Sequence, residues 1–170
     1  QVQRTWLRGE TTGEVVMVLD FANVGGALGV AKVVGTMVEA TVARYPGSWP
    51  RRALFVDEPT PAAQVHALPD AAPIAEHLVR FAEARGATPW VDRIPVTIAG
   101  AQVGIEPGDR QPDRLWLIDR EGAVLPLVPD TPVWEILART GNEPIDLFGE
   151  LERGAVRPLT LAVAGTVVAV

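Results

Sequence analysis

The chain consists of short apolar runs, most of them rich in valine, which glycine or proline interrupts every few residues. The first run, at 14–22, is continuous, and its β-branched residues predict a buried strand. Turns are predicted between the runs because the 170 residues include 16 glycines and 15 prolines. Further strands are predicted at 51–56, 94–98, 115–119, 123–128, 145–151, 156–163 and 166–170. Short strands joined by such turns indicate a sheet-rich fold with mostly antiparallel neighbours.

Two segments carry helical patterns instead. The first is predicted to be a helix over 71–85, where Ile74 and Phe81 lie on one apolar stripe with Leu78. Asp70 stands where an N-cap residue belongs.

The second helix is predicted over 131–140, with Thr131 as its N-cap, Pro132 at its first position and Gly141 at its end. The predicted fold class is therefore α+β, mostly antiparallel β with two short helices. Closely spaced prolines mark 59–69 as a linker. This linker divides the chain into a β-rich N-terminal lobe at 1–58 and an α+β C-terminal lobe at 70–170.

The segment 30–45 allows two interpretations. Its apolar residues recur at helical spacing, and a helix here would follow the Gly25–Gly29 loop and begin a nucleotide-binding βα unit. Its valines and threonines also favour a strand from Thr36 to Tyr45. The loop lacks both the G-x-G-x-x-G spacing and the P-loop lysine, which favours a plain connection. A small-molecule or nucleotide-binding domain using this loop is the first alternative function.

Charge limits the class of partner. The chain has 15 basic and 21 acidic residues and a formal net charge of −6. Nucleic-acid binders present a basic surface, because contacts with phosphates supply most of their affinity. The basic residues here are scattered, and Arg51-Arg52 is their single adjacent pair. Nucleic-acid binding through a patch of Arg44, Arg51 and Arg52 is therefore disfavoured and is kept as the second alternative.

The residue types that most catalytic sites need are missing or isolated. There is no cysteine, so the chain can form neither a disulfide nor a thiolate metal site. His66 and His77 are expected at the surface or as helix caps, because no further ligand lies at metal-site spacing. Ser48, the single serine, does not lie in a G-x-S-x-G motif.

Carboxylate groups at 57–58, 109–113 and 119–121 lie beside glycine or proline, where such side chains commonly stabilise turns. The sequence therefore predicts no catalytic, cofactor-binding or metal-binding residues and a non-enzymatic function.

Tryptophan offers the one candidate for partner binding. Core or hinge packing is the expected role for most of the five tryptophans, at positions 6, 49, 90, 116 and 134. Trp49 differs because prolines stiffen the turn around it and because Arg51 and Arg52 follow, and Trp and Arg are enriched at interfaces. Trp49, Arg51 and Arg52 are therefore the predicted partner-binding residues. A lid over the first sheet is the competing interpretation of Trp49.

Several short motifs together resemble the region that follows the zinc finger in bacterial SWIM zinc-finger family proteins. They are TWLRG at 5–9, VLDFA at 18–22, YPG at 45–47, RAL at 52–54, PWVDRIPV at 89–96, LWLIDREGAVLPL at 115–127, WEILARTG at 134–141, IDLFGE at 145–150 and RPL at 157–159. The resemblance favours strands for 36–45.

The resemblance also implies an accessory, protein-interaction role within a larger SWIM-type protein. A MoxR-type ATPase or a von Willebrand-type protein is the partner it implies. The finger needs a C-x-C…C-x-H ligand set, which this chain lacks, so zinc is expected only in a finger outside it and no cofactor within it.

The chain starts at Gln1 without a methionine or a signal-peptide core, which suggests a piece of a longer protein. Its apolar tail at 159–170 is shorter than the roughly 20 residues of a membrane span. A cytoplasmic location with no membrane partner is expected.

Overall fold

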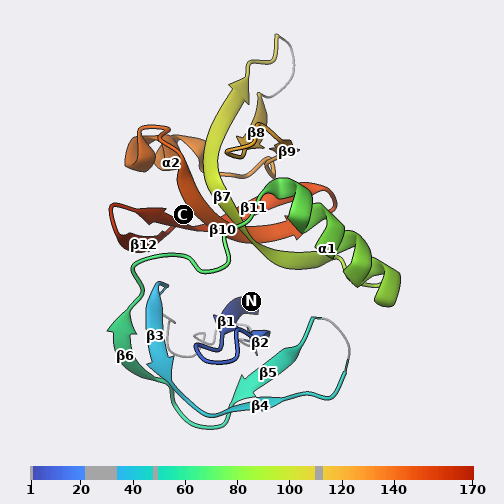
Figure 1. Ribbon diagram of the computed structural model, residues 1–170, viewed down its shortest axis with the longest axis vertical. Coiled ribbons are helices and arrows are strands. Elements are labelled where there is room, and N and C mark those ends of the chain that lie inside the picture. Colours follow the sequence, from blue (N-terminus) through green and yellow to red (C-terminus); the bar gives the residue numbers. More distant parts are fainter. Residues whose placement is uncertain (1, 22–33, 48–49, 110–112) are drawn as a thin grey trace. The chain divides into compact units, whose positions relative to one another are not determined.

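The computed structural model describes residues 2–21, 34–47, 50–109 and 113–170. These form mostly β structure with two helices, which confirms the predicted α+β class. The chain divides into two compact units, residues 1–64 and 65–170 (Figure 1).

The N-terminal unit holds a four-stranded sheet in the order β1-β2-β5-β4 and a two-stranded sheet of β3 and β6. The β2–β5 pair is parallel and the other pairs are antiparallel. A small core of Val16, Val18 and Ala53 lies between partly buried Leu7 and Phe55. The strands are β1 (Val2–Arg8), β2 (Val15–Phe21), β3 (Thr36–Glu39), β4 (Val42–Arg44), β5 (Arg52–Phe55) and β6 (Thr60–Gln64).

Residues 36–45 form β structure as predicted, and the helical alternative is wrong for them. The single predicted strand is divided into β3 and β4, which belong to different sheets. Gly25–Gly29 lies outside the described residues. Part of the predicted 59–69 linker forms β6, which pairs with β3 across a bulge between Met37 and Val38. Proline is tolerated beside such a bulge, and Pro61 lies opposite Val38 there.

The C-terminal unit is a barrel-like sheet in the order β12-β11-β10-β7-β8-β9. A parallel bridge between Leu127 and Val156 brings the end of β9 back to β11, so five strands close around one core. Its strands are β7 (Arg93–Glu106), β8 (Arg114–Ile118), β9 (Val124–Pro126), β10 (Ile145–Glu152), β11 (Ala155–Val163) and β12 (Thr166–Ala169). The core includes the fully buried Ile98, Leu117, Leu147, Leu151, Val156 and Leu161.

Closure depends on the curvature of β7, the long strand that crosses the unit in Figure 1. Its first half pairs with β10 and its second half with β8. The change of partner falls between Ala101 and Gln102. Just before it lies Gly100, where φ is +58° and an added Cβ would lie 2.9 Å from the Cβ of Arg120. Only glycine fits this conformation without strain. The Gly100 N–H donates to the carboxylate of Asp146, 3.1 Å away.

Helix α1 (Ile74–Ala87) begins later than predicted, and its N-terminus is held by a residue from elsewhere in the unit. The Ile74 N–H donates to Asp119, 2.8 Å away, so the prediction of Asp70 as the N-cap is wrong. The predicted stripe is also wrong at one position, because His77 is buried while Leu78 is exposed.

Helix α2 (Val133–Thr140) ends at Gly141 in the left-handed conformation, as predicted. Pro132 occupies its N-cap position, and the Thr131 hydroxyl donates instead to the Val128 carbonyl, 2.7 Å away. Neither helix of the described structure is long and apolar enough to cross a membrane.

Candidate functional site

The structure describes two of the three predicted partner-binding residues and gives them different partners. Trp49 lies outside the described residues. Arg51 forms an ion pair with Glu14, and Arg44 pairs with the other oxygen of the same carboxylate at 2.7 Å. Arg52 lies instead over the ring of Tyr45, with its guanidinium carbon 5.7 Å from the ring centroid. Adjacent residues around a strand start thus find different partners, as the alternation of side chains predicts.

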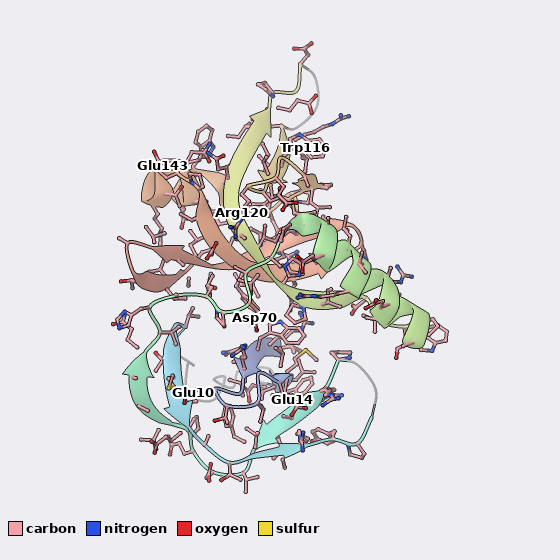
Figure 2. The ribbon with its side chains drawn as sticks, in the orientation of Figure 1. Glu10, Glu14, Asp70, Trp116, Arg120 and Glu143 are labelled. Atoms are coloured by element: carbon pink, nitrogen blue, oxygen red, sulfur yellow. The ribbon has the colours of Figure 1, made fainter. Side chains whose placement is uncertain are left out.

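The shared carboxylate offsets one of the three positive charges of the proposed basic patch. Glu14 lies immediately before β2, and Figure 2 shows it in the N-terminal unit. The hydrogen bond from Arg51, followed by the charge of Arg44, lowers the pKa of Glu14. Residues 1–64 contain six acidic and six basic residues, so this unit carries no net charge to attract phosphates.

The predicted turn carboxylates accept backbone hydrogen bonds. Asp57 accepts from the Thr41 N–H and Asp113 from the Gly108 N–H. Asp119 is buried and has the largest role, because one of its oxygens accepts from Glu121 and Ala123 while the other accepts from α1.

The two histidines differ in environment. His66 is exposed, with Nδ1 2.9 Å from the Gly165 carbonyl oxygen. His77 is 2% exposed, which shows that the surface or cap prediction is wrong for it. Its Nε2 lies 2.8 Å from the Thr97 carbonyl oxygen, while its buried Nδ1 has no hydrogen-bond partner. Within the described part of the chain, no group of three His, Asp or Glu residues could hold a metal ion.

An ionic network on β7, β10 and β11 was not foreseen from the sequence. Arg93 contacts Glu150 and Glu152, each at 3.0 Å, and Glu150 is 2% exposed. Arg157 continues the network, bonding Glu152 at 3.1 Å and Asp130 at 2.9 Å. Burial lowers the pKa of Arg93, but the bonds to Glu150 and Asp92 outweigh it and leave the pKa raised. Because Glu150 is buried, removal of Arg93 would leave its charge without compensation, which gives this network a structural role.

A second feature that the sequence did not predict is an open hollow of about 380 Å³ where α2 begins, here called the α2 hollow. Its apolar lining includes Leu115, Pro129, Pro132 and Trp134, and its carboxylates are Asp113 and Glu135. Trp134 is 70% exposed, and Trp90, in the same unit, is 91% exposed. The expectation of core or hinge packing is therefore wrong for these two tryptophans.

The local structure explains why Trp134 faces outward. Val133, Ile136 and Thr140 bury one face of α2, so the intervening Trp134 and Glu135 point away from the core.

Hydrogen bonds fix the turn that precedes α2. The Leu127 N–H donates to the Leu115 carbonyl at 2.8 Å, and the Val128 N–H donates to the Val156 carbonyl at 3.0 Å. Thr131 is buried and ties its hydroxyl to Val128. The two prolines that line the α2 hollow thus belong to a turn anchored on both β8 and β11.

Charge is unevenly distributed between the units, and the unit that holds the α2 hollow is the acidic one. Residues 65–170 contain fifteen acidic residues and nine arginines, which accounts for the whole net charge of −6. Asp130 is neutralised by Arg157, whose hydrogen bond lowers the pKa of Asp130. Asp113 and Glu135 have no ion-pair partner among the described residues. The α2 hollow therefore combines an exposed indole, two prolines and two carboxylates that form no ion pair with a residue that the structure describes.

In comparisons with known proteins, no family model, no curated protein and no solved structure matches this chain. The SWIM-family resemblance therefore stays a prediction.

Proposed function

We propose that this chain is a non-enzymatic protein-interaction module whose partner docks at the α2 hollow. The observation that carries the proposal is Trp134, a large apolar side chain that is 70% exposed on a helix whose other face is firmly buried. Binding energy at interfaces concentrates on such aromatic residues when a partner desolvates them. The anchored turn beside Trp134 supports the proposal further, because a rigid surface loses little entropy on binding.

Charge supports a protein partner over a nucleic acid. The six arginine and lysine residues of the N-terminal unit are balanced by six acidic residues, and the C-terminal unit is acidic. A phosphate backbone would be repelled by the unit that holds the α2 hollow.

The accessory role implied by the resemblance to SWIM zinc-finger proteins fits within this proposal. It makes a MoxR-type ATPase or a von Willebrand-type protein the proposed class of partner, with zinc held by a finger outside this chain.

The test uses the full chain labelled with ¹⁵N at its tryptophan indoles. Each indole N–H signal is assigned by a Trp→Phe substitution, and the chain is titrated with four octapeptide classes: arginine-bearing, glutamate-bearing, proline-rich neutral and leucine-rich. We expect at least one class to shift the Trp134 signal while the Trp90 signal stays in place. If no class moves the Trp134 signal of the folded chain, the proposal is wrong.

A further inference from the structure

We infer that the α2 hollow recognises an arginine side chain of a basic protein partner. This inference rests on the proposed function and names the chemistry of its partner. It is carried by the three kinds of group that line the hollow: an indole, two carboxylates and an apolar proline surface.

The indole supplies a face for a cation. Tryptophan is the best aromatic partner for a cation, and arginine is the cation found most often over an aromatic ring. In this chain Arg52 over Tyr45 and Arg85 over Phe81, at 5.7 and 5.8 Å, already show such pairs. Trp134 is far more exposed than a core aromatic and has no such cation over it among the described residues.

The carboxylates supply the matching charge. Glu14, Glu152 and Asp130 each face an arginine of the chain itself. One oxygen of Asp113 accepts a hydrogen bond from the Gly108 N–H. Glu135 forms no ion pair with a residue that the structure describes. A guanidinium is planar and carries five donors, so it can bond carboxylates while its flat face lies on an aromatic ring. An ammonium group has no such planar face, so lysine fits this set less well.

The prolines and Leu115 add apolar surface beside the indole and the carboxylates. The aliphatic part of an arginine side chain can pack against such a surface while its charged end bonds the carboxylates. The net charge of −6 on residues 65–170 favours approach of a basic segment and opposes an acidic or phosphorylated one.

The test measures the affinity of the full chain for one capped alanine–proline octapeptide that carries a single arginine. Citrulline in place of that arginine removes the positive charge and keeps the planar shape of the side-chain end. Lysine keeps the charge but has no planar group, and glutamate reverses the charge. Dissociation constants come from the shift of the Trp134 indole signal, or, for variants at that position, from isothermal titration calorimetry.

We expect the citrulline peptide to bind about tenfold more weakly than the arginine peptide and the lysine peptide to lie between them. Trp134→Ala should weaken the arginine peptide by about tenfold or more, whereas Trp90→Ala, at the more exposed tryptophan, should not. Glu135→Gln should weaken binding of the arginine peptide about threefold. The control Glu143→Gln removes the same charge at a position outside the α2 hollow and should leave this affinity unchanged.

Equal binding of the arginine and citrulline peptides, or tighter binding of the glutamate peptide, would overturn this inference. The proposed function would survive that result, because a peptide would still dock at Trp134. If the Trp134 signal responds to none of the peptides, both the inference and the proposed function fail.

Discussion

At the scale of single residues, the C-terminal unit contains a buried histidine, His77, and one nitrogen of its ring has no hydrogen-bond partner. The His77 Nε2 must carry the proton, because the Thr97 carbonyl oxygen 2.8 Å away can only accept. The buried Nδ1 then has no partner, and protonating it would add a charge within a buried setting. Burial, and next the charge of Arg80, lower the pKa of His77 against the hydrogen bond that raises it.

The lowered pKa predicts the direction of a pH effect on stability. In the unfolded chain, His77 takes up a proton near its ordinary pKa of 6.5. In the folded chain it does so only at a lower pH, so its contribution to the free energy of unfolding is complete above pH 6.5. It is lost as the pH falls from 6.5 through the lower pKa of the folded state. We expect the urea midpoint to fall between about pH 7.5 and about pH 5.5, and His77→Gln to flatten this dependence. An unchanged dependence in His77→Gln, equal to that of the control His66→Gln, would contradict this assignment.

Because of the hydrogen bonds that Asp119 accepts, we expect its substitution to lower the free energy of unfolding strongly. Its carboxylate accepts three backbone N–H groups, those of Ile74, Glu121 and Ala123, from two segments far apart in sequence. Asp119→Ala leaves these donors without an acceptor, and we expect a loss of about 2–4 kcal/mol in the free energy of unfolding. Chemical denaturation measures it. Glu121→Ala, an exposed residue of the same turn, should cost less than about 0.5 kcal/mol, and equal losses would argue against the capping role.

The sequence predicted these residue roles only where the cause is local. The different partners of Arg51 and Arg52 follow from the alternation of side chains where a strand begins, which is a local cause. The capping of α1 by Asp119 and the burial of His77 depend on residues 45 and 20 positions away, which no local pattern contains. Trp134 was foreseen as one of five tryptophans but not as exposed, because an isolated helix does not reveal which face the barrel covers.

At the scale of the elements, Gly149 of β10 leaves no room for a side chain beside the backbone of β11. The register shifts there between Phe148 and Gly149, and an added Cβ would collide with the Arg157 carbonyl oxygen. The collision involves backbone and cannot be relieved by a side-chain rotation. We expect Gly149→Ala to lower the free energy of unfolding by about 1–3 kcal/mol.

A second glycine provides the matched control for this prediction. Gly86 lies inside α1, where an added Cβ meets nothing within 4 Å. Gly86→Ala should raise the free energy of unfolding by about 0.5–1 kcal/mol, because alanine restricts the unfolded chain and favours a helix. Thermal and urea denaturation of the two variants separate the effects. Stabilisation by Gly149→Ala would contradict the close approach of the two strands.

Elements with a strong local pattern were predicted well and elements without one were missed. The valine-rich strands β2 and β11 and both helices lie where periodicity placed them. Strand β1 was missed because its polar residues mask any alternation, and the second half of β7 because Gly100 and alanines interrupt it. These strands form because their neighbours in the sheet supply hydrogen bonds that the sequence alone does not show.

At the scale of the whole molecule, the two units differ in the size of their cores. Of the buried apolar residues among those the structure describes, four lie in residues 1–64 and twenty in residues 65–170. A domain of about 60 residues buries only about 60% of its unfolded surface and is marginal even with an ordinary core. We expect residues 65–170 expressed alone to unfold cooperatively and residues 1–64 alone to show no cooperative transition. Circular dichroism during thermal unfolding tests both, and a cooperative transition in the shorter piece alone would contradict this division of stability.

The unit that holds most of the buried apolar residues described by the structure also holds the net charge and the α2 hollow. This arrangement gives a stable, acidic scaffold with a rigid turn and an exposed indole, which is the basis of the proposed interaction. Long-range attraction of a basic partner should depend on salt, because the charges that attract it are exposed to solvent.

The most direct measurement of the central claim is contact between a bound arginine and Trp134. The full chain, with protonated tryptophan rings in a deuterated background, is mixed with the arginine-bearing octapeptide at saturating concentration. Intermolecular nuclear Overhauser effects are then recorded from the arginine δ-methylene protons. We predict cross-peaks to the Trp134 ring and none to the rings of Trp90 or Trp116. Cross-peaks to another tryptophan with none to Trp134 would contradict the assignment of the α2 hollow as the docking site.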